Sequence, residues 1–270
     1  MNNILITGGS RGLGLAYAKG LSKKGFNIII ADISEDACKV YDDKVSIEQI
    51  LHNLRLNGTK VNFIKADLSS QEEANNMIEV CLKKYGSLYG IITNAGGDIA
   101  GNDSNASGGK AMNNSFLIDY DEHENIFKRN YYTCLHTLRA AVPHFKDQKY
   151  GKILTVSSVN AAFGVNKETS YSIAKSAVIQ LTRSLAKELR EYGINVNCLM
   201  PGPVKTDRFL STLKGRNDHD LKEINSKERL QRTANEEDIV PVVEFLMSEK
   251  SNFISGEIIK VDGGLFPQPI

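Results

Sequence analysis

The sequence predicts one α/β domain, in which helices cover both faces of a doubly wound parallel sheet of about seven strands. Short apolar runs alternate with helix-length amphipathic segments along nearly the whole chain. A glycine-rich turn lies between the first apolar run and the first helical segment. The 270 residues contain no repeat and no linker-like tract, so residues 1–270 are expected to form a single unit.

The apolar runs have the length and composition of strands that are buried on both faces. They are Ile4–Thr7, Asn27–Ala31, Val61–Lys65, Leu88–Thr93, Lys152–Val156, Ile194–Leu199 and Glu257–Val261. Because strands that alternate with helices form βαβ units, we expect these strands to run parallel.

Helix ends are marked by capping signals. Ser46–Gln49 and Ser70–Glu73 both predict capping boxes. The helices that they begin are expected to end at Asn57-Gly58 and Tyr85-Gly86. Two longer helical segments are expected, over Asp121–Phe145 and over Thr169–Glu191 as far as Gly193.

Three stretches interrupt this alternation. Ser34–Val45 reads as an irregular insertion, Gly96–Asp119 as a long polar loop, and Lys205–Arg232 as a charged mobile cover. Loops of this length within a compact domain are more often functional than not.

Composition excludes several classes of protein. The net charge of +1 argues against a nucleic-acid partner. No basic leader and no membrane-length apolar stretch is present, so we expect a soluble, cytoplasmic protein without a membrane partner. The four scattered cysteines fit a reducing compartment. The histidines lack partners at ligand spacing, so no metal site is expected.

The glycine-rich turn Thr7–Gly14 predicts a dinucleotide site, because it allows a pyrophosphate to approach the positive end of the following helix. Asp32, at the end of the second strand, is expected to accept hydrogen bonds from the adenosine ribose hydroxyls and to repel a 2′-phosphate. Arg11 opposes this preference, since its guanidinium could pair with that phosphate. The pattern favours NAD, with NADP possible.

The chain resembles the short-chain dehydrogenase/reductase family. The resemblance is carried by Thr7–Gly14, Asn94-Ala95-Gly96, Ser158, Tyr171–Lys175 and Pro201-Gly202, which occur in the family's order. It covers essentially the whole chain and implies a Rossmann-type fold, a nicotinamide cofactor and a homotetramer built on the helices that carry Asn130 and Tyr171.

The resemblance also implies cofactor contacts at several positions. Asp67 matches an aspartate at the adenine pocket, Asn94 a residue that steadies the central sheet, and Thr206 a contact to the nicotinamide carboxamide. The full set implied to contact the cofactor is Gly8, Ser10, Arg11, Gly12, Leu13, Gly14, Asp32, Asp67, Leu68, Asn94, Ala95, Gly96, Tyr171, Lys175, Pro201, Gly202, Val204 and Thr206.

Tyr171 and Lys175 are four residues apart and therefore face the same way on a helix. A phenol of pKa about 10 is a weak base at neutral pH, and an adjacent ammonium favours the phenolate that a general base requires. Ser158 follows a strand and is expected to bind the substrate oxygen. Asn130 matches the family's fourth catalytic residue, which holds a water that links Lys175 to solvent.

The function expected from these residues is hydride transfer between a nicotinamide and a secondary alcohol, a polyol or a sugar. An NADP-linked 3-oxoacyl-(acyl-carrier-protein) or ketone reductase is the alternative, and the long insertions at 33–45 and 97–119 argue mildly against the 3-oxoacyl reductase. A cofactor-sensing protein without turnover is disfavoured, because it would be expected to lack Tyr171 or Lys175.

Overall fold

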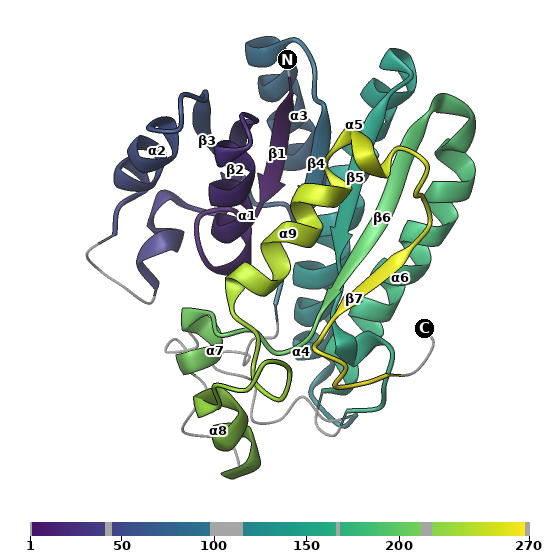
Figure 1. The fold of residues 1–270 in the computed structure, drawn as a ribbon. Coiled ribbons are helices and arrows are strands. Elements are labelled where there is room, and N and C mark those ends of the chain that lie inside the picture. Colours follow the sequence, from purple (N-terminus) through teal and green to yellow (C-terminus); the bar gives the residue numbers. More distant parts are fainter. Residues whose placement is uncertain (1, 41–44, 98–115, 166–167, 212–217, 268–270) are drawn as a thin grey trace.

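The computed structural model describes residues 2–40, 45–97, 116–165, 168–211 and 218–267 (Figure 1). Its centre is a seven-stranded sheet in the order β3-β2-β1-β4-β5-β6-β7, and every pair of neighbouring strands is parallel. The strands are β1 (Asn3–Thr7), β2 (Asn27–Asp32), β3 (Val61–Lys65), β4 (Gly90–Thr93), β5 (Gly151–Val156), β6 (Ile194–Pro201) and β7 (Ile258–Val261). The predicted α/β fold class and all seven strands are confirmed.

The two faces of the sheet are covered by different helices. Alternate residues of β1 face opposite sides, as the two-residue period of a strand requires. Ile4 and Ile6 pack in one core cluster with α1 (Gly12–Lys23), α2 (Ile47–Arg55) and α9 (Glu236–Leu246). Leu5 packs in the other cluster, with α3 (Gln71–Tyr85), α5 (Thr133–Gln148) and α6 (Thr169–Leu189). Helices therefore cover both faces of the sheet, as expected for strands that are apolar on both faces.

The two capping signals differ in outcome. Ser46 and Gln49 form a complete capping box at the start of α2. The Ser70 hydroxyl likewise accepts from the Glu73 amide, but the Glu73 carboxylate accepts from the Asp67 amide instead of closing the second box. The second box is therefore only half formed, because the turn that follows β3 offers Glu73 another donor.

The long helical segments contain breaks in regularity that the periodicity did not reveal. The segment around Asn130 consists of α4 (Tyr120–Phe127), a π-helical turn (Lys128–Tyr132) and α5. α6 continues through a 3₁₀ turn (Arg190–Tyr192) and ends at Gly193, in the left-handed conformation, as expected. Further 3₁₀ turns span Val159–Ala161 and Glu249–Ser251.

The insertions are partly helical. Glu35–Val40, within the first, forms a 3₁₀ helix. The charged stretch after β6 contains α7 (Asp207–Ser211) and α8 (Asp218–Asn225), which lie beyond the carboxyl ends of the strands (Figure 1). Most of the expected polar loop Gly96–Asp119 falls outside the described residues. Among the helices of the described ranges, none combines the length and hydropathy needed to cross a bilayer.

Candidate active site

A cavity of about 810 Å³ opens at the carboxyl ends of the strands, where the strand order reverses between β1 and β4. Open α/β sheets bind their ligands at this position. Most of the residues predicted from the sequence line it: Gly8, Arg11, Gly12, Leu13, Asp32, Asp67, Leu68, Asn94, Ala95, Gly96, Ser158, Tyr171, Lys175, Pro201, Gly202, Val204 and Thr206. Ser10, Gly14 and Asn130 are not among the lining residues. Each contacts a residue that does line the cavity: Ser10 bonds Asp32, Gly14 packs against Gly8, and Asn130 bonds Gly97.

The glycine turn folds tightly between β1 and α1. A Cβ atom on Gly14 would lie 2.1 Å from the Gly8 carbonyl oxygen, so any side chain there would displace the turn. The amide of Asn94 donates to the carbonyl oxygens of Thr7 (3.3 Å) and Gly8 (3.1 Å). Asn94 thus joins the end of β4 to the turn, which agrees with the steadying role that the resemblance implies.

Asp32 ends β2 at the edge of the cavity and is held by the turn itself. Its carboxylate accepts from the Ser10 amide at 3.2 Å and makes a second, short hydrogen bond with the Ser10 hydroxyl. The other carboxylate oxygen accepts from the Ile33 amide at 2.9 Å. Ser10, which the resemblance implies to contact the cofactor, thus bonds Asp32 through both its amide and its hydroxyl.

Asp67 and Leu68 form the adjoining wall after β3. The Asp67 carboxylate accepts from the amide and the hydroxyl of Ser69, at 3.0 and 2.7 Å. These bonds fix the turn between β3 and α3 beside Asp32, so the two carboxylates lie at the same end of the cavity.

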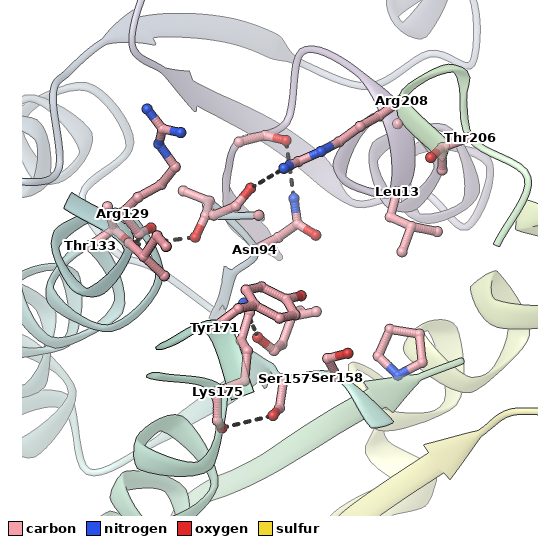
Figure 2. Close-up of a pocket in the computed structure, with 18 of the residues that line it drawn as sticks. Leu13, Asn94, Arg129, Thr133, Ser157, Ser158, Tyr171, Lys175, Thr206 and Arg208 are labelled. Atoms are coloured by element: carbon pink, nitrogen blue, oxygen red, sulfur yellow. Dashed lines mark hydrogen bonds between the residues drawn. The ribbon is translucent and has the colours of Figure 1, made fainter. Parts of the chain in front are cut away.

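Ser158, Tyr171 and Lys175 lie together on one side of the cavity (Figure 2). Lys175 is 4% exposed, its ammonium donates to the Val156 carbonyl oxygen at 3.0 Å, and its nitrogen lies 5.9 Å from the centroid of the Tyr171 ring. Burial lowers the pKa of Lys175 to about 8. The hydroxyl of Ser157 donates to the Lys175 carbonyl oxygen at 2.8 Å, which ties the end of β5 to α6.

Asn130 is buried in the π-helical turn and acts on the backbone after β4. Its side-chain oxygen accepts from the Gly97 amide at 2.7 Å, and its nitrogen donates to the carbonyl oxygens of Gly97 (3.1 Å) and Ile126 (3.0 Å). A Cβ atom on Gly96 would lie 2.9 Å from the Asn130 oxygen and 3.3 Å from the Lys175 nitrogen. Asn130 therefore lies near Lys175, separated from the cavity by Gly96 and Gly97.

Several lining residues were not predicted from the sequence. Arg208, on α7, donates to the Gly96 carbonyl oxygen at 3.2 Å from the side of the cavity opposite Tyr171 (Figure 2). The others, away from the glycine turn, include Glu122, Asn125, Arg129, Asn160, Glu168 and Phe209. Glu168 lies only three positions before Tyr171, and this short spacing is the feature of the sequence that could have indicated its place in the cavity wall.

The glycine-turn end of the cavity fits a dinucleotide. Gly12 has a φ of +50°, which L side chains rarely adopt, and a Cβ atom there would contact the Thr206 methyl carbon at 3.8 Å. The first turn of α1 contains no acidic residue, so the positive end of the helix is available to phosphates. Across the described part of the chain, no group of three or more His, Cys, Asp and Glu side chains is placed to hold a metal ion.

Comparison with known proteins agrees with this geometry. The family model described as "Enoyl-(Acyl carrier protein) reductase" matches residues 8–266. The chain is 30% identical to the cyclohexanol dehydrogenase of Rhodococcus sp. (strain TK6), over 97% of this chain and 94% of that protein. It is 29% identical to the 3-oxoacyl-(acyl-carrier-protein) reductase FabG of Aggregatibacter actinomycetemcomitans, over 97% and 98%.

Among solved structures, a short-chain type dehydrogenase/reductase from Mycobacterium ulcerans superposes with a TM-score of 0.82 at 23% identity, over 97% of this chain and 89% of that one. That likeness shows the shared fold, and the match of the family model extends over nearly the whole chain. This protein therefore belongs to the short-chain dehydrogenase/reductase family and is an oxidoreductase acting on alcohol and carbonyl groups with a nicotinamide cofactor.

Proposed function

We propose that this short-chain dehydrogenase/reductase is an NAD-linked dehydrogenase of a secondary alcohol, a polyol or a sugar, with Tyr171 as general acid and base. The observation that carries the proposal is that one cavity is lined by Tyr171, Lys175 and Ser158 together with the glycine turn and Asp32. A proton-transfer group and a dinucleotide site are thereby brought within reach of a single substrate.

The residues divide the work of oxidation. The Tyr171 phenolate takes the proton of the substrate hydroxyl, and the Ser158 hydroxyl hydrogen-bonds the same oxygen. The buried ammonium of Lys175 favours the phenolate, and the residue also binds the nicotinamide ribose. The nicotinamide, when bound, accepts the hydride in this direction and supplies it in the reverse one. The family resemblance also implies a water at Asn130 through which Lys175 exchanges protons with solvent, although the side-chain hydrogen bonds of Asn130 go to Gly97 and Ile126.

A second candidate is an NADP-linked reductase of 3-oxoacyl thioesters or ketones. It is favoured by the similarity to the 3-oxoacyl reductase and by Arg11, which lines the cavity near the adenine end. A panel of alcohols and carbonyl compounds, read by the absorbance of the reduced nicotinamide with each cofactor, separates the two candidates. Turnover of 3-oxoacyl thioesters with NADPH alone would favour the second.

The Tyr171→Phe variant tests the general acid/base role. We expect turnover to fall at least about a hundredfold, because the proton acceptor is lost, while the Kd for NADH is nearly unchanged. The Tyr192→Phe variant, altered on the 3₁₀ turn after α6 and away from the cavity, is the matched control. If Tyr171→Phe keeps more than a tenth of wild-type turnover, Tyr171 does not carry the proton transfer.

We also propose a homotetramer, built on the α4–α5 segment and α6. Apolar side chains exposed near this face support the proposal: Phe116, Leu117, Tyr120 and Ile173 are between 48% and 87% exposed. The molar mass from light scattering tests the oligomeric state.

The four cysteines are buried thiols without disulfides, which agrees with the proposed reducing, cytoplasmic location.

A further inference from the structure

Glu168 is a carboxylate in the wall of the active-site cavity that the proposed chemistry does not use. It precedes α6 directly, lies three residues before Tyr171, lines the cavity and is 7% exposed. Carboxylates are rarely buried to this extent, and where they are, the surroundings compensate the charge or the charge has a purpose.

Helix capping does not account for this carboxylate. Glu168 occupies the N-cap position of α6, but its side chain makes no capping hydrogen bond to the helix. Its carboxylate accepts a hydrogen bond from the side-chain amide of Asn160, which also lines the cavity. The carboxylate is thus bonded to Asn160 rather than to the first turn of the helix.

Asn160 connects this carboxylate with the proposed catalytic serine. The Asn160 backbone amide donates to the Ser158 hydroxyl oxygen at 3.3 Å, while its side-chain amide donates to Glu168. Asn160 therefore links the hydroxyl that is proposed to bind the reacting oxygen with a second acceptor, the Glu168 carboxylate, through two hydrogen bonds. An ionised carboxylate accepts hydrogen bonds and donates none, so it selects a donor.

The rest of this end of the cavity combines polar and apolar side chains. Its polar residues are Glu122, Asn125 and Arg129, on α4 and the π-helical turn, and Arg208 on α7, while Ile126, Val159 and Phe209 are apolar. A plain hydrocarbon ring or acyl chain would remove water from the polar groups without replacing its hydrogen bonds, and that loss opposes binding. A substrate with several hydroxyl groups would replace the hydrogen bonds that the displaced water had made.

Building on the proposed function, we infer that Glu168 is a specificity-determining residue that accepts a hydrogen bond from a second hydroxyl close to the reacting one. The substrate class is therefore a vicinal diol or polyol rather than a simple secondary alcohol. Asn160 is the positioning residue for this contact, since it orients the carboxylate without touching the reacting atoms.

The test compares two substrates that differ by one hydroxyl, cyclohexanol and 1,2-cyclohexanediol, with NAD. Wild-type enzyme is expected to oxidise the diol with a kcat/KM at least about tenfold higher, the value of one charge-assisted hydrogen bond. Glu168→Gln keeps the shape and an oxygen that can accept from Asn160. We expect it to lose most of the preference while its kcat/KM for cyclohexanol changes less than threefold.

A binding measurement separates recognition from turnover. The Kd of 1,2-cyclohexanediol for the complex of the enzyme with NADH, followed by NADH fluorescence, is expected to rise about tenfold in Glu168→Gln. The Kd for NADH itself and the melting temperature should stay at wild-type values, which a merely structural role would not predict. Glu79→Gln, on the exposed side of α3, is the matched control and should change none of these quantities.

The outcomes keep the two proposals apart. Equal kcat/KM for cyclohexanol and the diol in wild-type enzyme, or a preference unchanged in Glu168→Gln, overturns the role of Glu168 and leaves the dehydrogenase assignment standing. A wild-type enzyme that oxidises no secondary alcohol with NAD overturns the proposed function, and the inference with it.

Discussion

At the scale of single residues, the contact between Ser10 and Asp32 bears on the choice of cofactor. The Ser10 amide and hydroxyl both lie on the Asp32 carboxylate, which fixes an acceptor at the end of β2. A fixed carboxylate favours a ribose that offers hydroxyl donors and opposes one that carries a phosphate. Arg11 lines the same cavity, so the preference is a balance of the two charges.

The Asp32→Ala variant measures this balance. We expect the preference for NAD over NADP, expressed as a ratio of kcat/KM values, to narrow by tenfold or more, which corresponds to about 1.4 kcal/mol. Asp36→Ala, which removes an exposed carboxylate paired with Lys39, is the control and should leave the ratio unchanged. A constant ratio in Asp32→Ala would show that this carboxylate does not reach the ribose, and Arg11→Ala would then be tested.

Lys175 links the proposed chemistry to stability. Burial lowers its pKa to about 8, against 10.5 in the unfolded chain, because the cavity disfavours the ammonium. The folded state therefore binds this proton less tightly than the unfolded state. The resulting destabilisation is fully present below pH 8, and it is relieved as the pH rises from 8 to 10.5.

The unfolding free energy of wild-type protein, minus that of Lys175→Met, should accordingly rise by up to about 3 kcal/mol over this interval. Urea unfolding at several pH values measures the difference, in which groups common to both proteins cancel. Lys187→Met, exposed on the same helix, should show no such rise. If the difference in unfolding free energy stays constant or falls as the pH rises, the pKa of Lys175 is not lowered in the folded protein.

At the scale of elements, the π-helical turn between α4 and α5 shapes the end of β4. Its Asn130 makes three hydrogen bonds with backbone groups of Gly97 and Ile126. Thr133, at the start of α5, adds a bond from its hydroxyl to the Ala95 carbonyl oxygen at 3.2 Å. The helix thus holds the strand end that borders Lys175.

The Asn130→Ala variant should lose both stability and activity. Buried backbone groups left without their side-chain partners cost about 1–3 kcal/mol of unfolding free energy. We expect a lower melting temperature together with a kcat reduced at least tenfold, because Gly96 and Gly97 lose their support beside Lys175. Asn76→Ala, exposed on α3, is the control. Wild-type kcat in Asn130→Ala would separate this residue from the proton pathway.

At the scale of the whole molecule, both faces of one continuous sheet are packed against helices. The two core clusters share alternate residues of the same strands, so neither face can lose its cover without exposing the sheet. The proposed cofactor site draws on β1, β2 and β4 and on the segments after β3 and β6. Ligand binding should therefore stabilise the chain as one unit.

Calorimetry tests the single-domain prediction. We expect one unfolding transition for residues 1–270, with calorimetric and van't Hoff enthalpies in agreement. NADH at a hundred times its Kd should stabilise this transition by about 2.7 kcal/mol. Two transitions, of which only one moves with NADH, would show two independent units.

The sequence alone determined the fold class, the seven strands, the glycine turn and the shared helix face of Tyr171 and Lys175, whereas the grouping of these two residues with Ser158 came from the family resemblance. These features depend on local patterns, since apolar runs, capping residues and the four-residue spacing on a helix lie within short windows. The family resemblance extended the same order over the chain, and the cavity contains most of the residues that it implied.

The tertiary structure decided the contacts between segments that are distant in sequence. Only the packed chain shows that Ser10 bonds Asp32, that Asn130 lies behind Gly97, and that Glu73 serves the turn after β3 rather than its own capping box. The same holds for Asn160, which joins Ser158 to Glu168. Such hydrogen bonds depend on the direction of each side chain after packing, and no one-dimensional pattern contains that direction.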